Sequence, residues 1–540
     1  MVVKKNVSES VSVILPFKEG LPYKVNDFKN TIKSLLNQIE PPKEIIVVDG
    51  RGKEANSSII PGTGKSKVKI KHVKGSYKNQ ASQWNAGFKA AKGDNLLLVD
   101  TNVGQIEFPD SSLAVFKMAL SRDPKKIGMI YSDYESVDAS EKSVEVHLLD
   151  YHPGRLREQT NLGSVCLCPA SKIKDIKGMS EKYNHAHWYD FRLKLASRSK
   201  LVHINNKVRG SLYRVHTPPT KFNVFDYLLA GKDAQLEMEA ACTAHLKRLG
   251  AYLKPGEHVK KVKADKTKTK CLASVVIPVY QRPKFIAEAI ESIQNQTVKN
   301  IEAVIVVNGG PEDPTVDAVK RYIKGGDKYD PSKPEVRCIV VDVNNIGFCL
   351  NYGCMNARGK YYVQLDSDDQ LKPDAVEKIL EVFESDPTIG MVIGSYDVWE
   401  QDPKTKKIIR KEEIPVVTHD EWTAKNGRNN LLRVNGAGAP RSINIKVLEE
   451  VGWFGLNDSK WTRNYGEDYD LVSRISEQYT IGRVWEPIYK VIRHSGSTDH
   501  SIDQVTIDRN DEAKDWMRLE AIKRRRILNG LPAEGRGVEL

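Results

Sequence analysis

The chain lacks any long uninterrupted run of apolar residues. Nowhere do 18 apolar residues follow one another, so no segment has the sequence of a membrane-spanning helix. The first residues include two lysines, but neither an apolar core nor a small-residue cleavage site follows them, which argues against a secretion signal. From these two absences we expect a cytoplasmic protein.

Cysteine is scarce and follows no pattern. The chain has 7 cysteines in 540 residues, and Cys166-Leu-Cys168 has no second pair with which to form a zinc site. An odd, scattered set is typical of free thiols in a reducing compartment. Low-complexity sequence is also absent. With 40% apolar and 28% charged residues, the chain has the composition and the length of two large globular domains.

Acidic residues are outnumbered by basic ones. The chain has 83 lysines and arginines against 70 aspartates and glutamates, which gives a net charge of +13. Such a surplus suits an anionic partner, whether a nucleotide-sugar, an anionic lipid headgroup or a nucleic acid. Charge alone does not choose among the three.

The chain contains two copies of one pattern of motifs. The corresponding residues, in chain order, are Pro16 and Pro278, Asp49 and Asn308, Asp100 and Asp366, Asp190 and Asp468, and His216 and His494. Their separation stays between 259 and 278 residues, which indicates duplication of a whole domain. The second copy ends one strand in Asp366-Ser-Asp368-Asp369, where the first has only Asp100-Thr101-Asn102. We therefore expect the chemistry in the second copy.

Each copy begins as strand, helix, strand. Apolar, β-branched runs predict strands at 11–16, 45–48 and 96–99 in the first copy and at 273–278, 303–307 and 361–365 in the second. Helices are predicted at 28–39 and 285–294. This order is that of a mostly parallel, doubly wound α/β sheet, in which ligands bind at the carboxyl ends of the strands. We expect domains at 1–252 and 272–505, a lysine-rich linker at 253–271 and a helical tail at 506–540.

The acidic turn Asp366-Ser-Asp368-Asp369 has two interpretations. Carboxylates two positions apart after a strand suit a hard divalent cation that keeps open positions for phosphate oxygens and water. Alternatively, Asp369 caps a helix predicted at 372–384. The surrounding motifs favour the cation.

Together these motifs resemble family 2 glycosyltransferases with the GT-A fold. The segments that carry the resemblance are Val275–Tyr280, Ser292–Gln296, Asn344–Gly347 with Asn351 and Gly353, Asp366–Asp369, Val451–Phe454, Gly466–Leu471 and Arg493-His494. The resemblance covers most of the second copy and, more weakly, the first. It implies two tandem GT-A domains, which are Rossmann-like α/β units with a mostly parallel sheet, followed by the C-terminal helical tail.

The implied activity is an inverting, metal-dependent transfer of a sugar from a nucleotide-sugar to a hydroxyl of a glycan, a glycolipid or a glycoprotein. Asp366, Asp368 and His494 would bind Mn²⁺ or Mg²⁺, while Asp468 would be the general base and the adjacent Glu467 would help to position the acceptor. The residues implied in donor binding are Pro278, Tyr280, Asn308, Asn345, Asn351, Asp366 and Ser367. A UDP-sugar is favoured as donor. The family often has paired aspartates where this chain has Asn308-Gly309, which leaves the uridine preference open.

The first copy keeps fewer of these residues. Its counterparts are Asp49, Asp100, Asp190 and His216, but Asn102 replaces the second carboxylate of the turn. The leading hypothesis is a degenerate domain that shapes the protein or holds the acceptor. The rival is a second active transferase, which would make the chain bifunctional.

Three further hypotheses stay open. The first takes DNA with hydroxylated bases as the acceptor, as in phage-type modification, although the sequence has no recognised nucleic-acid module. The second is a non-catalytic scaffold that binds nucleotide-sugars or carbohydrates. The third is peripheral membrane contact, in which Lys523-Arg-Arg-Arg526 docks a helix on anionic lipid. The alternative for this run is a solvated helix end whose charge suits the helix dipole.

Overall fold

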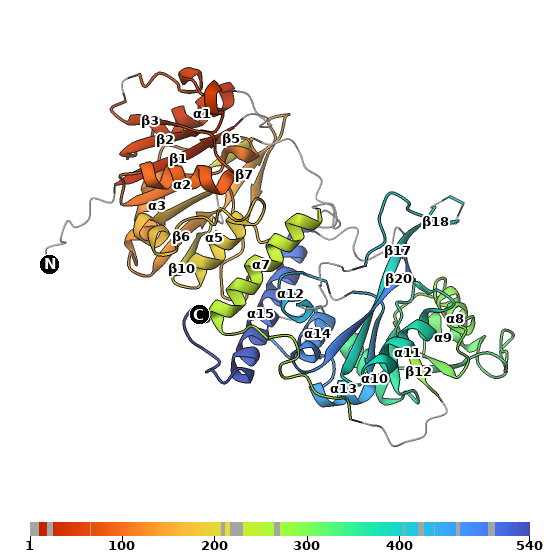
Figure 1. The fold of residues 1–540 in the computed structure, drawn as a ribbon. Helices are drawn as coiled ribbons and strands as arrows, with labels where there is room; N and C mark the ends of the chain where they lie inside the picture. The colour runs from red at the N-terminus through yellow and green to blue at the C-terminus, as the bar shows by residue number, and fades with distance from the viewer. Residues whose placement is uncertain are drawn as a thin grey trace, which may run out of the picture. The chain divides into compact units, whose positions relative to one another are not determined.

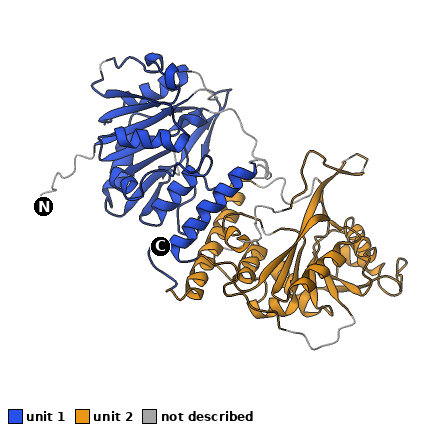
Figure 2. Cartoon of the chain, in the orientation of Figure 1, with its two compact units in different colours: residues 1–251, 532–540 blue, residues 252–531 orange. Residues whose placement is uncertain are grey.

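The computed structural model describes residues 10–18, 25–64, 66–206, 211–216, 231–263, 271–402, 404–405, 407–418, 426–436, 438–460, 465–494 and 503–539. The first residues of the chain and positions 264–270 of the expected linker lie outside this set. The chain forms two compact units: unit 1 is residues 1–251 with 532–540, and unit 2 is residues 252–531 (Figure 2). Within the described ranges, no helix combines the length and the apolar character needed to cross a bilayer.

Unit 1 is built on a seven-stranded sheet in the order β10-β6-β9-β4-β1-β2-β3 (Figure 1). Its strands are β1 (Val11–Phe17), β2 (Glu44–Asp49), β3 (Lys69–Lys74), β4 (Asn95–Val99), β6 (Ile127–Ser132), β9 (Val165–Pro169) and β10 (Lys200–Ile204). Neighbours are parallel except at β9, which runs antiparallel to β4 and β6. A smaller sheet, β5-β11-β7-β8, contains β5 (Gln105–Glu107), β7 (Tyr134–Val137), β8 (Ser143–Val146) and β11 (Arg214–His216).

Helices cover both faces of the larger sheet. One face packs on α1 (Val25–Leu36) and α3 (Ser112–Ser121), and the other on α2 (Gln80–Ala90), α4 (Ala170–Asp175) and α5 (His187–Ala196). Helix α7 (Lys232–Leu249) packs on α5, and short 3-10 turns occur at η1 (Gly52–Glu54), η2 (Ser57–Ile59) and η3 (Thr101–Val103). Every residue of β1, β2 and β4 is buried, as expected of parallel strands between two helical layers.

Unit 2 contains a nine-stranded sheet in the order β14-β13-β12-β15-β19-β17-β20-β16, with β18 beside β17. Its strands are β12 (Ala273–Val279), β13 (Ile301–Val307), β14 (Glu335–Val340), β15 (Tyr361–Gln364), β16 (Gln370–Leu371), β17 (Ile389–Gln401), β18 (Ile408–Arg410), β19 (Arg441–Asn444) and β20 (Thr480–Arg493). One face packs on α8 (Ile286–Gln294), α9 (Thr315–Lys320) and α11 (Ala375–Ser385). The other packs on α10 (Ile346–Met355), α13 (Ile445–Val451) and α14 (Glu467–Gln478), with α12 (Gly427–Asn430) and α15 (Gln504–Leu528) beside α14.

The two sheets match strand for strand. Taken from β3, the strands of unit 1 follow the same spatial order as β14, β13, β12, β15, β19, β17 and β20 of unit 2. The long strand β17 of unit 2 corresponds to two strands of unit 1, β6 and β7. In the same way, β20 corresponds to β10 and β11. Strand β11 is parallel to β7 and antiparallel to β5, as β20 is to β17 and β16. The predicted duplication and the predicted mostly parallel α/β sheets are confirmed.

A buried polar junction repeats in atomic detail. In unit 1 the Ser12 hydroxyl donates to Glu44 (2.7 Å) and accepts from the Gly93 N–H (2.8 Å). In unit 2 the Ser274 hydroxyl donates to Glu302 (2.7 Å) and accepts from the N–H of Gly359 (3.0 Å). Each junction ties the start of three parallel strands together, because its members come from or directly precede β1, β2 and β4, or β12, β13 and β15.

The last helix of each unit packs on the second helix after the antiparallel strand, which is β9 in unit 1 and β19 in unit 2. Helix α7 lies on α5, and α15 lies on α14. The sequence separates 506–540 as a tail, but α15 buries Ala513, Met517 and Ile522 within unit 2. Part of the expected linker packs there too, since the Val262 N–H donates to the Pro387 carbonyl (2.8 Å).

We predict that Glu302→Ala lowers the unfolding free energy by about 2–3 kcal/mol, because it leaves buried hydrogen-bond donors without an acceptor. The Ser274 hydroxyl and the Arg358 N–H both donate to Glu302. Thermal unfolding followed by circular dichroism measures the effect. The control is Glu335→Ala, which removes an exposed carboxylate from the neighbouring strand and should change stability by less than about 0.5 kcal/mol. Equal losses in the two variants would contradict the assignment.

Candidate active site

The acidic turn of unit 2 lies at the carboxyl end of β15 and is held there by β20. The N–H of Asp366 donates to the Tyr489 hydroxyl (3.1 Å), and the N–H of Ile492 donates to the Asp369 carboxylate (2.8 Å). Asp369 therefore fastens β20 to the turn. The helix-cap interpretation of Asp369 is wrong, because its carboxylate faces β20 and α11 begins only at Ala375.

Asp368, in the same turn, contacts a histidine and an arginine. Asp368 Oδ2 lies 2.9 Å from His494 Nε2 and 2.8 Å from Arg282 Nη1. His494 follows β20, and its ring stacks on Phe285 with the centroids 4.4 Å apart. Arg282 lies in the loop after β12, where its N–H donates to the Thr315 hydroxyl (2.9 Å). The structure thus brings together Asp368 and His494, two predicted ligands of one cation.

This pair fits a divalent cation with few protein ligands. Asp368 offers a carboxylate oxygen and His494 a ring nitrogen at one point, and Mg²⁺ sites beside phosphates often leave the other positions to phosphate oxygens and water. Across the described residues, no cluster of three or more His, Cys, Asp or Glu side chains is arranged to hold a metal. Asp366, the third predicted ligand, instead accepts from the Gln364 amide (3.1 Å).

A chain of polar contacts connects the acidic turn with the start of α14. Gln364 donates to Asp366 and accepts from Arg441 Nε (3.0 Å), and Arg441 Nη1 lies 3.0 Å from Asp468 Oδ2. Arg441 opens β19 and also donates to the Gly438 carbonyl (2.6 Å). Asp366 and Asp468, predicted to serve the donor and the acceptor, are therefore coupled through one arginine.

The adjacent carboxylates Glu467 and Asp468 differ in their affinity for a proton. Burial favours the protonated form of Asp468, but the positive charges of Arg441 and Lys514 outweigh it and lower the pKa of Asp468. Burial and the negative charge of Asp468 raise the pKa of Glu467. Of the two, Asp468 is the carboxylate that stays ionised at neutral pH.

The predicted base pocket lies where β12 and β13 end. Asn308 follows β13 and is buried, with its Nδ2 3.4 Å from Asn344 Oδ1 and 3.5 Å from Cys349 Sγ. Its Oδ1 finds no hydrogen-bond partner among the described residues. Tyr280 is 45% exposed just beyond β12, and Pro278 is half-buried within that strand. A buried acceptor without a partner calls for an explanation, and a ligand that binds at this edge is one.

Two of the residues predicted to bind the donor also form hydrogen bonds between segments of unit 2. Asn345 caps α10 by accepting from the Phe348 N–H (2.9 Å), and its amide nitrogen donates to a backbone carbonyl after α13 (3.2 Å). Asn351 is buried, and its amide makes two bonds of 2.9 Å with the backbone of Phe454. Both amides already form hydrogen bonds within the protein, and their role in donor binding stays a prediction. Ser367 lies half-buried in the acidic turn.

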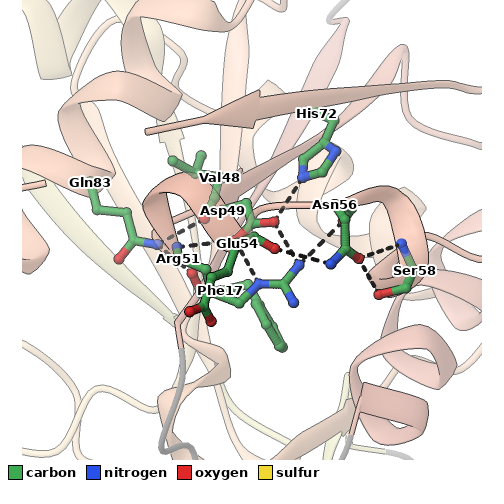
Figure 3. A network of polar contacts seen from close by, with 9 residues as sticks. All are labelled: Phe17, Val48, Asp49, Arg51, Glu54, Asn56, Ser58, His72 and Gln83. Carbon is green, nitrogen blue, oxygen red and sulfur yellow. Dashed lines mark hydrogen bonds and ion pairs between the residues drawn. The ribbon is translucent and has the colours of Figure 1, made fainter. Parts of the chain in front are cut away.

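The same sheet edge of unit 1 is closed by its own side chains. Asp49, the counterpart of Asn308, is fully buried and pairs with Arg51 and His72, each at 2.9 Å (Figure 3). The Arg51 guanidinium also lies 5.1 Å from the centre of the Phe17 ring. Burial would raise the pKa of Asp49, but the hydrogen bonds from Arg51 and His72 outweigh it and lower the pKa. This carboxylate is already neutralised by internal partners.

The acidic turn of unit 1 is replaced by a closed polar turn. Asn102 stands at the position of Asp368, and its amide donates to Asp100 Oδ1 (2.6 Å). His216, the counterpart of His494, lies 3.3 Å from Glu107 of the neighbouring strand β5. Unit 1 therefore has an amide–carboxylate contact where unit 2 has a carboxylate, a histidine and an arginine.

The structure corrects the register proposed for Asp190. Asp190 is the fourth residue of α5 and pairs with Lys194 one turn later (2.6 Å). The fourth residue of α14 is Asp470, which pairs in the same way with Arg474 (2.9 Å). Asp190 therefore corresponds to Asp470, and not to Asp468.

The neighbouring tyrosines agree with this register. Tyr189 and Tyr469 each donate to a leucine carbonyl, at 2.6 Å and 2.7 Å. With these two matched, Trp188 occupies the place of Asp468. Unit 1 thus has no carboxylate at the position of the predicted base.

The basic run of α15 faces the interior of unit 2. Arg525 is fully buried and donates to the Arg428 carbonyl (2.7 Å), while Arg524 pairs with Glu477 on α14 (3.0 Å). Guanidinium groups packed in this way are not presented to a lipid surface. The run therefore does not support the membrane hypothesis.

Sequence reasoning missed the cations of this site. Arg282, Arg441 and Lys514 belong to none of the motifs that carry the family resemblance. The sequence signal that could have pointed to the two arginines is the proline beside each of them, Pro283 after Arg282 and Pro440 before Arg441. A proline at such a place marks a turn at the end or the start of a strand.

Comparison with known proteins identifies the class of protein. The family model described as "Glycosyl transferase family 2" matches residues 12–102 and 274–452, which together make half of the chain. The chain belongs to glycosyl transferase family 2. The match falls in two segments, one in each unit, which is the tandem form that the resemblance implied.

The chain is similar to several named glycosyltransferases. It is 32% identical to an uncharacterized glycosyltransferase of Rickettsia bellii over 218 residues, which are 40% of this chain and 29% of that protein. It is 30% identical to chondroitin synthase of Escherichia coli over 310 residues, 57% of this chain and 40% of that protein. Hyaluronan synthase of Pasteurella multocida is 36% identical over 121 residues, 22% of this chain and 12% of that protein. The chain thus spans less than half the length of these curated relatives.

Among solved structures, the chain is similar to a mannosyltransferase from Pyrobaculum calidifontis in complex with GDP-mannose and Mn²⁺. The identity is 14%, and the match covers 55% of this chain and 83% of that chain. The TM-score of 0.33 is too low to support a further argument. The metal question therefore rests on the residues of this chain.

We predict that Glu467→Gln changes the pH dependence of stability. The folded state holds the Glu467 proton to higher pH than the unfolded chain does, so folding takes up a proton above the ordinary pKa of 4.5. The unfolding free energy of the wild type therefore falls as the pH rises above 4.5. Relative to the wild type, the variant should become more stable by up to about 1.4 kcal/mol for each pH unit of this rise. Urea unfolding at pH 5 to 8 measures this. The exposed Glu449→Gln is the control, and parallel profiles for wild type and Glu467→Gln would contradict the assignment.

Proposed function

We propose that unit 2 transfers a sugar from a nucleotide-sugar to an acceptor hydroxyl with inversion at the anomeric carbon. The observation that supports this most is the chain Asp366–Gln364–Arg441–Asp468, which couples the acidic turn to an ionised carboxylate at a helix start. A sugar hydroxyl is a poor nucleophile, and a carboxylate within hydrogen-bond reach activates it by accepting its proton.

In the proposed mechanism Asp468 accepts the hydroxyl proton as the acceptor oxygen attacks the anomeric carbon. The new carbon–oxygen bond forms while the bond to the diphosphate breaks, and the leaving nucleoside diphosphate keeps that electron pair. A single displacement of this kind inverts the anomeric centre. The ion pair with Arg441 fixes the orientation of the Asp468 carboxylate. Glu467, which holds its proton more tightly, is placed to donate a hydrogen bond to the acceptor.

Asp368 and His494 would hold a divalent cation, Mn²⁺ or Mg²⁺, on the donor side of this site. When bound, the cation supplies positive charge that stabilises the leaving diphosphate. Arg282 shares the same oxygen of Asp368 and adds a guanidinium that is able to bind phosphate oxygens. Asp369 and Tyr489 keep the turn and β20 together, which holds Asp368 and His494 at one point.

We propose a UDP-sugar as the donor. The buried Oδ1 of Asn308 is an acceptor without a partner among the described residues, and the uracil N3–H is a donor of matching chemistry. Tyr280, exposed beside it, offers an aromatic face to the base. For the acceptor we propose a glycan hydroxyl, because two relatives bear the names chondroitin synthase and hyaluronan synthase.

We further propose that unit 1 does not turn over donor. Asp49 is neutralised by Arg51 and His72, Asn102 stands at the position of Asp368, and Trp188 stands at the position of the base. Each of the three positions that unit 2 would use for base reading, cation binding and proton transfer is thus altered. A structural or acceptor-holding role is left for this unit.

We predict that the chain releases nucleoside diphosphate from one nucleotide-sugar in a panel when Mn²⁺ or Mg²⁺ is present, and that EDTA stops the release. Asp368→Ala and Asp468→Asn should each lower kcat at least about 100-fold, since the first loses a ligand of the cation that stabilises the leaving diphosphate and the second loses the base. The exposed Asp317→Ala is the control. Release that survives both active-site changes would overturn the assignment, and a product that keeps the donor's anomeric configuration would overturn inversion.

The bifunctional alternative has its own test. We predict that Asp100→Ala leaves every transfer product unchanged, with rates within about twofold of wild type, because no donor is turned over in unit 1. Asp366→Ala is the matched change in unit 2 and should abolish all products. Loss of one product in Asp100→Ala, with the others retained, would establish a second active unit. Product analysis by mass spectrometry distinguishes the two results.

A further inference from the structure

Helix α15 lies outside both segments that match the family model, yet it packs directly on the start of α14. Gly466 precedes Glu467 and has a left-handed backbone, with φ at +84°. A Cβ atom built on Gly466 would lie 2.8 Å from Met517 Cε of α15. A side chain here would displace the Met517 methyl group, and the left-handed backbone itself favours glycine, so the start of α14 packs closely on α15.

Two cations on one face of α15 reach the same region. Lys514 is buried, and its Nζ donates to the Asn435 carbonyl (2.8 Å) and lies 4.7 Å from the centre of the Tyr465 ring. Arg518, one turn later, donates to the Val434 carbonyl (2.8 Å) and lies 4.7 Å over the ring of Tyr469. These bonds join the segment 432–435 to the segment 465–469.

The second of these segments contains one partner of the ion pair at the proposed base, and the first precedes the other partner in the sequence. The first leads through Pro440 into Arg441, and the second contains Asp468. Lys514 therefore contacts the segment that contains Asp468 and, through the Asn435 carbonyl, the segment that precedes Arg441 in the sequence. Its own charge adds to that of Arg441, because Asp468 raises the pKa of Lys514 against the effect of burial, and Lys514 lowers the pKa of Asp468.

Unit 1 provides an internal comparison. In unit 1, helix α7 packs on α5 as α15 packs on α14 in unit 2, and we call α7 and α15 the companion helices. The Glu237 carboxylate of α7 lies at the start of α5, where it accepts from the backbone N–H groups of Asn184 (3.0 Å), His185 (2.7 Å) and Ala186 (3.1 Å). The companion helix thus contacts the same place in both units, but with opposite charge. The lysine occurs in the unit whose helix begins with two carboxylates, and the glutamate in the unit whose helix begins with His187 and Trp188.

We propose that α15 is a working part of the catalytic unit and that Lys514 is the residue that positions Asp468 and its partner Arg441. The proposal rests on the transferase function proposed for unit 2. It makes Lys514 a positioning residue, because its ammonium group is buried and bonded to the Asn435 carbonyl. It also explains why the companion helix carries a lysine in one unit and a glutamate in the other.

The test compares Lys514→Met, which keeps the length of the side chain without its charge, with Lys514→Arg, which restores a cation. The control on the same helix is Arg524→Met, which removes a charge bound to Glu477 on α14. Hydrogen exchange by mass spectrometry reports on peptides covering 431–436 and 465–470. Steady-state kinetics with the preferred donor gives kcat and KM separately.

Lys514→Met should speed exchange in both peptides and lower kcat at least about 10-fold, with the donor KM within about twofold of wild type, since only orientation of the base is lost. Lys514→Arg should recover most of kcat, and Arg524→Met should keep it. Unchanged exchange and unchanged kcat in a folded Lys514→Met protein would overturn the proposal. Faster exchange in both peptides of a protein that turns over no donor would support the positioning role and overturn the transferase function instead.

Discussion

The gathering of negative charge at one sheet edge is the constraint on which unit 2 depends. Asp366, Asp368 and Asp468 influence one another there, and burial together with like charge raises the pKa of Asp366. Such a cluster is stable only when cations lie among the carboxylates. Arg282 comes from the loop after β12, Arg441 from β19 and Lys514 from α15, so three distant parts of the chain must fold together before the site exists.

Unit 1 shows what the same scaffold does without that charge. It keeps the strand order and the buried Ser12–Glu44 junction, which hold the sheet together whatever lies at its edge. At the edge itself the acidic turn has become Asp100 bound to the Asn102 amide, and the companion helix brings a glutamate in place of a lysine. Scaffold and site therefore vary independently, and the charge of the companion helix follows the site.

The scaffold can be predicted from the sequence, because it depends on repeated local patterns. Runs such as Ile45–Val48 and Ala303–Val307 predict buried parallel strands, and the carboxyl ends of such strands meet at one edge. Asp368 and His494 were brought together as expected.

The three cations were not predicted, because a single lysine or arginine in a loop or helix carries no periodic signal. The resemblance assigns Asn351 to the donor, and its bonds to the Phe454 backbone were not predicted, because an asparagine amide suits a ligand and a backbone segment equally well. The register of Asp190 was two residues off, because loop lengths differ between the copies and only the helix start and its ion pair fix the alignment.

The central claim is that only one of the two copies retains a donor site. The most direct measurement is the number of nucleoside diphosphate molecules bound per chain, obtained by calorimetric titration in the presence of Mn²⁺. The account predicts one molecule per chain, with binding lost in a chain that lacks the Asp368 carboxylate and kept in one that lacks the Asp100 carboxylate. Two molecules per chain, or binding that depends on Asp100 and not on Asp368, would contradict it.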